Sequence, residues 1–172
     1  MKKLSLLFLI ITIFSCDSPR QIMDSETAQK ETSERRTSPN AQKINTNVAV
    51  DFLNSYIESS QYFEDQYGIV HWANASPMAT QNFKNTLEKM VRDAFEADPQ
   101  MGLGAHPLFD AQDFPMKGYE VYSANYDTGY VTVNSTEWDG FHVLVKLVNQ
   151  GGKTLVDGCG VVNIPEADQL PR

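Results

Sequence analysis

The chain has 172 residues and a formal net charge of −8. Residues 17–46 hold five basic and five acidic side chains, so the negative excess lies on residues 47–172. An acidic domain repels nucleic-acid phosphates and anionic lipid headgroups, which argues against a nucleic-acid partner. The size of residues 47–172 suits one hydrophobic core and not two.

The first residues have the pattern of an export signal. Lys2 and Lys3 precede an apolar run over residues 4–14, which is too short to cross a hydrocarbon core of about 30 Å as a helix. Residues 13–16 (IFSC) resemble the lipobox of bacterial lipoproteins. The resemblance implies a signal peptide over residues 1–15 and lipid attachment at Cys16. It also implies a protein anchored to a membrane of the bacterial cell envelope, which we expect to be the outer membrane, facing the periplasm or the cell surface.

Residues 16–46 are predicted to be the lipid anchor and a flexible linker. Residues 17–46 contain no aromatic side chain and are rich in Ser, Thr, Gln and Asn with balanced charges. Such a segment cannot bury enough apolar surface to offset the entropy that ordering would cost. We therefore expect the folded domain to begin at residue 47.

Three helices are predicted upstream of the strands. The first covers residues 47–60, where Val48, Phe52 and Tyr56 recur every four residues and form an apolar stripe. A short second helix and a loop suit residues 61–75. The third helix has the clearest pattern, with Ser76 as its predicted N-cap, Pro77 at its first position and an end before Pro99.

Residues 118–164 are predicted to form four short strands. Val131 and Val133 alternate with polar residues, and Phe141, Val143, Val145 and Leu147 recur at every second position further on. This period of two indicates a sheet with one apolar face that the helices must cover. The predicted fold class is α+β: a cone-like domain in which two to three N-terminal helices pack on a curved four-stranded antiparallel sheet.

A long connection over residues 98–118 joins the helices to the strands. Loops of this length without regular structure are uncommon and often functional. Its apolar residues Leu103, Leu108, Phe109 and Phe114 are expected to hold it to the body of the domain.

The order of elements resembles the nuclear-transport-factor-2-like fold. Asp98-Pro99 and the later residues 112–115 (QDFP) are similar to the signature of a bacterial family of small secreted proteins and lipoproteins whose function is not established. The resemblance covers about residues 48–164 and implies this fold for a domain over residues 47–172. It also implies export to the envelope and a pocket between helices and sheet, but it supplies no catalytic residues.

Two kinds of chemical site are weighed and not favoured. Asp98, His106, Asp110 and Asp113 share the loop, but their spacing matches no calcium loop, and single aspartates commonly cap turns. A pocket enzyme would pair His71, His106 or His142 with a carboxylate, but no spacing typical of a catalytic motif supports it. We predict no metal, no cofactor and no enzymatic activity.

The tyrosines and tryptophans are the best candidates for a binding role, because their rings supply apolar area while their polar atoms contact partners. The predicted function is a non-enzymatic binding module for a small ligand or an envelope protein. Its binding residues are predicted to be Tyr56, Tyr62, Trp72 and Tyr130. The alternative is a docking subunit of an envelope complex, or a homodimer, that uses exposed tyrosines of the sheet. Cys159 is interpreted either as a small, partly buried side chain between two glycines or as a reactive thiol.

Overall fold

A computed structural model of the chain describes residues 43–65 and 67–170, which lie within one compact unit. The predicted signal peptide, Cys16 and the linker up to residue 42 lie outside the described residues. No helix in the described part is long and apolar enough to cross a membrane. The elements in chain order are α1 (Asn47–Ser60), α2 (Gly68–Ala75), α3 (Gln81–Ala97), β1 (Tyr119–Asn125), β2 (Tyr130–Ser135), β3 (His142–Gln150), β4 (Lys153–Cys159) and a short 3₁₀ helix η1 (Glu166–Asp168).

The four strands form one open antiparallel sheet in the order β1-β2-β3-β4. The predicted alternation is present, since five aliphatic side chains of β2 and β3 are buried on one face: Val131, Val133, Val143, Val145 and Leu147. Three helices pack against this sheet, so the α+β prediction is confirmed.

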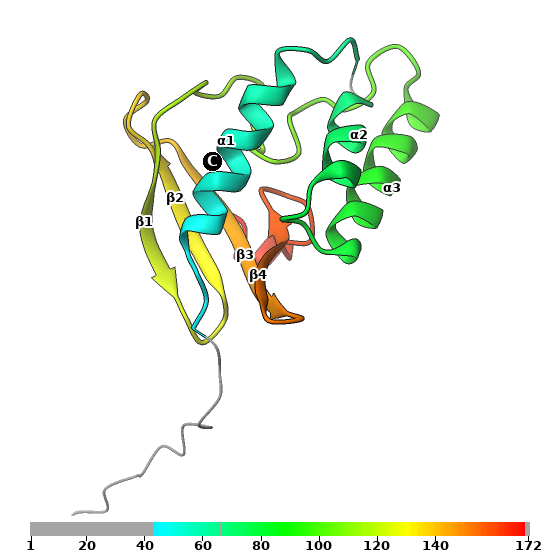
Figure 1. The fold of residues 1–172 in the computed structure, drawn as a ribbon. Helices are drawn as coiled ribbons and strands as arrows, with labels where there is room; N and C mark the ends of the chain where they lie inside the picture. Colours follow the sequence, from blue (N-terminus) through cyan, green and yellow to red (C-terminus); the bar gives the residue numbers. More distant parts are fainter. Residues whose placement is uncertain (1–42, 66, 171–172) are drawn as a thin grey trace, which may run out of the picture. The chain divides into compact units, whose positions relative to one another are not determined.

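The helices cover the apolar face in two groups. Helix α1 contacts all four strands, and α2 and α3 lie side by side next to it (Figure 1). Phe52 of α1 joins the groups, because its ring lies 4.9 Å from that of Trp72 in α2 and 5.4 Å from that of Phe83 in α3. The space between helices and sheet is therefore filled by a hydrophobic core.

The start of α3 differs from the prediction. Ser76 ends α2, since its backbone N–H donates to Trp72 O at 2.9 Å. The next residues run beside β4, where Val156 N–H donates to Met78 O at 2.8 Å and Thr80 N–H donates to Val156 O at 2.9 Å. Because these backbone groups are bonded to β4, the helix begins only at Gln81. Thr80 is the N-cap, since its side-chain hydroxyl accepts a hydrogen bond from Phe83 N–H.

A β-bulge changes which residues of β4 face the core. Lys146 pairs with Gly158 and Leu147 pairs with Val156, so Asp157 is the extra residue. Strict alternation along β4 would put Cys159 and Val156 on opposite faces of the sheet, but both side chains are fully buried. The extra residue shifts the register by one, and Cys159 is buried opposite Val145.

Candidate ligand-binding site

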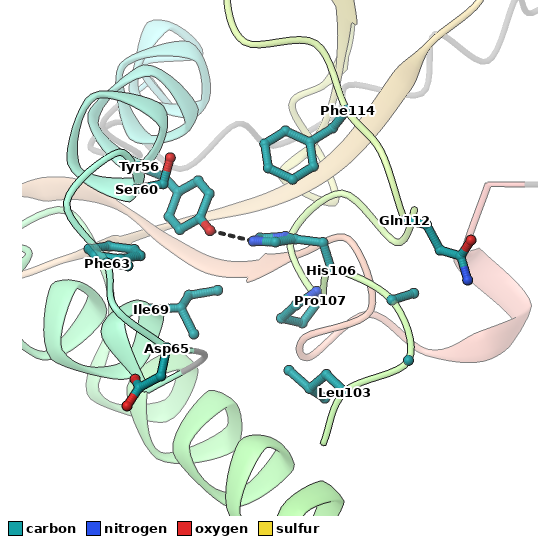
Figure 2. A pocket seen from close by; sticks show the side chains of 12 residues that line it. Tyr56, Ser60, Phe63, Asp65, Ile69, Leu103, His106, Pro107, Gln112 and Phe114 are labelled. Carbon is teal, nitrogen blue, oxygen red and sulfur yellow. Dashed lines mark hydrogen bonds between the residues drawn. The ribbon is translucent and has the colours of Figure 1, made fainter. Parts of the chain in front are cut away.

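A cavity of about 450 Å³ lies between the end of α1, the start of α2 and the long loop that precedes β1. Figure 2 shows Tyr56 and His106 approaching each other from opposite walls, with Phe63 and Ile69 on the helical side. Most of the lining is apolar, and the full set is Tyr56, Ser60, Phe63, Asp65, Ile69, Leu103, Gly104, Ala105, His106, Pro107, Gln112 and Phe114.

The loop holds His106 in place with its own backbone. His106 N–H donates to Ala111 O at 2.8 Å, and Asp110 N–H donates to His106 O at 2.6 Å. Asp110 takes a positive φ of 49°, which closes the turn. The imidazole is therefore carried on a folded loop segment, with its ring directed toward Tyr56 (Figure 2).

The end of β4 fastens the same loop segment to the sheet. Val161 N–H donates to Pro107 O at 3.0 Å, and the Cys159 thiol donates to Leu108 O at 3.4 Å. Gly160 has φ +60°, and a Cβ there would lie 2.4 Å from Pro107 O. Only glycine permits this close approach of two backbones.

A hydrogen bond of 2.5 Å joins His106 Nε2 and the Tyr56 hydroxyl. The other ring nitrogen, Nδ1, accepts from Leu108 N–H at 3.2 Å. Burial lowers the pKa of His106 to about 4 and raises the pKa of Tyr56 to about 12. Both side chains are therefore uncharged at neutral pH.

Aromatic rings surround this polar pair. The His106 ring lies 4.8 Å from Phe114 and 5.0 Å from Phe109, and these two phenylalanines stack on each other at 4.0 Å. Phe63 lies 5.8 Å from Tyr56 on the helical side. Such surroundings keep the local dielectric low and strengthen hydrogen bonds made inside them.

The structure separates the four side chains predicted to bind. Tyr56 lines the cavity, and Trp72 is buried behind it with ring centroids 5.1 Å apart. Tyr62 is 84% exposed and does not line the cavity. Tyr130 lies on the sheet face away from the helices, where its hydroxyl donates to Asp168 at 3.0 Å and Lys146 lies over its ring.

The cavity uses residues that the sequence did not single out for binding. Phe63 and Ile69 come from the segment predicted only as a short helix and loop. Leu103 and Phe114 were predicted to hold the loop against the domain, and both pack on the core while also lining the cavity. The unusual length of the loop was the one signal that pointed to this region.

The residues of the metal alternative are used in other ways. Asp98 accepts from Gln100 N–H and Met101 N–H, both at 3.0 Å, which is the turn-capping role of a single aspartate. Across residues 43–65 and 67–170, no group of three or more His, Cys, Asp or Glu side chains could hold a metal ion.

The histidines of the enzyme alternative do not meet at one site. His71 and His142 are both exposed, and the His142 ring lies 5.1 Å from Tyr122 on the outer face of the sheet. Cys159 is fully buried, and burial raises the pKa of its thiol. The thiol form is poorly nucleophilic, so the structure favours the buried interpretation over a reactive cysteine.

Comparisons of this chain with protein families, with curated proteins and with solved structures found no match. The resemblance to nuclear-transport-factor-2-like lipoproteins therefore stays a prediction that depends on residues of the loop.

Proposed function

We propose that this protein is a non-enzymatic binding module that holds a small, largely apolar molecule in the cavity beside the loop. The observation that carries the proposal is the cavity itself, whose largely apolar walls surround the hydrogen bond between buried Tyr56 and partly buried His106. Its volume of about 450 Å³ lies within the range typical of small-molecule sites.

Binding without chemistry is favoured by the state of His106. Both of its ring nitrogens are engaged, one with Tyr56 and one with the backbone of Leu108. A general base needs a free lone pair and a pKa near the working pH, whereas burial lowers the pKa of this group to about 4. The pair is therefore better suited to holding a ligand than to moving protons.

The entry of the chain into the domain supports a tethered binding module. Asn45 N–H donates to Thr154 Oγ1 at 3.1 Å, next to the β3–β4 hairpin, just before α1 begins. The cavity lies at the other end of α1, and a helix of 14 residues is about 21 Å long. A lipid anchor at Cys16, as the lipobox resemblance implies, would be connected to the domain through the start of α1, which is the end away from the cavity.

The test is a titration of the folded domain with N-phenyl-1-naphthylamine, an uncharged probe whose fluorescence rises in apolar sites. Gly104 lines the cavity, and a Cβ added there meets no atom within 4 Å, so Gly104→Trp places a large ring at the cavity wall without a steric clash at its Cβ. We expect saturable binding by the wild type and at least a tenfold loss in Gly104→Trp. The control Glu88→Trp places the same side chain on the exposed face of α3 and should bind as the wild type does. Equal binding by both variants would contradict the proposal.

A second candidate is docking through the outer face of the sheet. Tyr122 is the extra residue of a β-bulge in β1 and is 68% exposed, with its ring against His142. Exposed aromatic rings are enriched in protein interfaces. If this face mediates self-association, Tyr122→Ala should shift a dimer to monomer in sedimentation velocity, and a wild type that sediments as a monomer at every concentration would exclude the homodimer.

A further inference from the structure

The hydrogen-bond direction within the Tyr56–His106 pair follows from the backbone. Leu108 N–H points at His106 Nδ1, so Nδ1 must be the acceptor and carry no hydrogen. A neutral imidazole has one N–H, which is then on Nε2. That hydrogen is donated to the Tyr56 oxygen over the 2.5 Å contact.

This arrangement leaves the hydrogen of the Tyr56 hydroxyl without an acceptor. The hydroxyl has no other hydrogen-bond partner among the residues that the structure describes, although Tyr56 is only 5% exposed. A buried donor without a partner is costly, and a ligand that accepts from it removes that cost. Tyr56 lines the cavity, and Figure 2 shows its hydroxyl directed away from α1 toward His106 among the lining side chains, so an acceptor placed there can reach it.

We infer that the ligand of this cavity presents an uncharged oxygen acceptor, as in a ketone, aldehyde or ester, to the Tyr56 hydroxyl and carries it on an apolar, ring-sized body. This inference rests on the proposed function and adds the chemical class of the ligand. The donor is selective because its direction is fixed: His106 occupies one lone pair of the Tyr56 oxygen and leaves its hydrogen for the ligand.

The charges of the cavity exclude the ionic alternatives. Among the described residues that line the cavity there is no lysine or arginine, and their one acidic member, Asp65, is exposed. A carboxylate ligand would lose its hydration without gaining a counter-ion. An ammonium ligand has no lone pair with which to accept from Tyr56 and would meet the same loss of hydration at the buried pair.

The experiment compares four ligands of one shape by competition against N-phenyl-1-naphthylamine. They are 2-acetylnaphthalene, its oxygen-free isostere 2-isopropenylnaphthalene, 2-naphthoate and 2-naphthylmethylammonium. We expect the ketone to bind about tenfold more tightly than the isostere, which corresponds to one buried hydrogen bond, and both ions to bind more weakly still.

Tyr56→Phe keeps the ring and removes the donor, so the ketone and its isostere should then bind equally. The matched control is Tyr62→Phe, which makes the same change at an exposed hydroxyl outside the cavity and should leave the tenfold preference intact. A preference that survives Tyr56→Phe would overturn the inference.

A measurement on the wild-type protein tests the tautomer of His106 without any substitution. Long-range ¹H–¹⁵N spectra report the histidine tautomer directly, and we expect the hydrogen of His106 on Nε2. A hydrogen on Nδ1 would overturn the inference, as would tightest binding of 2-naphthoate. If the ketone and isostere bind the wild type equally while Gly104→Trp still blocks the probe, the ligand class is wrong and the proposed function survives. If no probe binds at all, both fail.

Discussion

Helix α1 carries two neighbouring environments that differ in how they are filled. Phe52 is fully buried against Trp72 and Phe83, within the hydrophobic core. Tyr56, one turn later on the same stripe, faces a cavity of about 450 Å³ and holds a polar partner from the loop. The same helix face thus contributes to structure at one turn and to a binding site at the next.

The difference comes from what each turn faces. The apolar side chains of the sheet repeat every two residues, and they form one hydrophobic cluster with side chains of the three helices. The loop that faces Tyr56 has no such repeat, and its course is set by backbone bonds at His106, Pro107 and Leu108. The cavity is therefore found where irregular chain replaces a strand or a helix.

The largest effect should separate the two environments directly. Phe52→Ala removes a fully buried ring and should lower the free energy of unfolding by about 3–5 kcal/mol. Phe63→Ala removes a partly exposed ring from the cavity wall and should cost less than half as much. Urea denaturation of both variants provides the measurement, and equal losses would show that the cavity side is packed as tightly as the core.

The next effect concerns acid stability. Below about pH 6.5 the unfolded chain binds a proton at His106, whereas the folded protein remains unprotonated there until about pH 4. The free energy of unfolding therefore falls as the pH drops from 6.5 toward 4. The loss that His106 causes is about 1.4 kcal/mol per pH unit and about 3 kcal/mol in all.

The control for this pH effect is His106→Gln, which cannot titrate. The substitution leaves every other side chain of the protein unchanged, so the difference between the two unfolding curves isolates the histidine. Parallel curves between pH 7 and pH 4 would show that the imidazole is hydrated and not enclosed by Phe109 and Phe114.

A smaller loss of stability is expected where the loop over residues 98–118 contacts the end of β4. Gly160→Ala introduces a Cβ against Pro107 O at a positive φ and should cost about 2 kcal/mol or more. Gly140→Ala is the matched control, because Gly140 also has a positive φ, of +75°, but a Cβ there meets no atom within 4 Å. The difference between their thermal unfolding curves measures the close approach alone, and no difference would mean that the loop can move away freely.

The smallest expected loss of stability concerns the N-cap of α3, away from the cavity. Thr80→Ala removes the N-cap of α3 and its 2.7 Å bond to Asp157, at a cost of about 1 kcal/mol. Thr80→Ser keeps the hydroxyl and should retain most of that stability. Binding of N-phenyl-1-naphthylamine should not change in either variant. A weakened affinity would show that the two environments of α1 are coupled.

Local patterns predicted the regular elements well. Alternation at residues 131–133 and 143–147 placed the buried row of the sheet, and the apolar stripe of residues 47–60 placed α1. The predicted start of α3 was wrong because residues before this helix form backbone hydrogen bonds with another element, β4. Ser76 has the residue type of an N-cap, but the backbone groups of Met78 and Thr80 form hydrogen bonds with Val156 of β4. Helix α3 therefore begins only at Gln81.

The candidate site was only partly predictable. Tyr56 was named among the binding residues and His106 was considered only as a possible ligand or base, with nothing to connect them. They are 50 positions apart, and their contact depends on the turn at Asp110 and on the glycine at position 160. Contacts of this kind leave no periodic trace in the sequence.

The order of residues alone determined the fold class, because helix and strand periods are local and each demands one buried face. It also determined the acidic character of the domain and the lipobox-like start of the chain. Only the tertiary structure decided that Cys159 faces inward, that Tyr62 and Tyr130 lie apart from Tyr56, and that Tyr56 meets His106. These features depend on a one-residue bulge and on hydrogen bonds between distant segments, and such bonds exist only once the chain has folded.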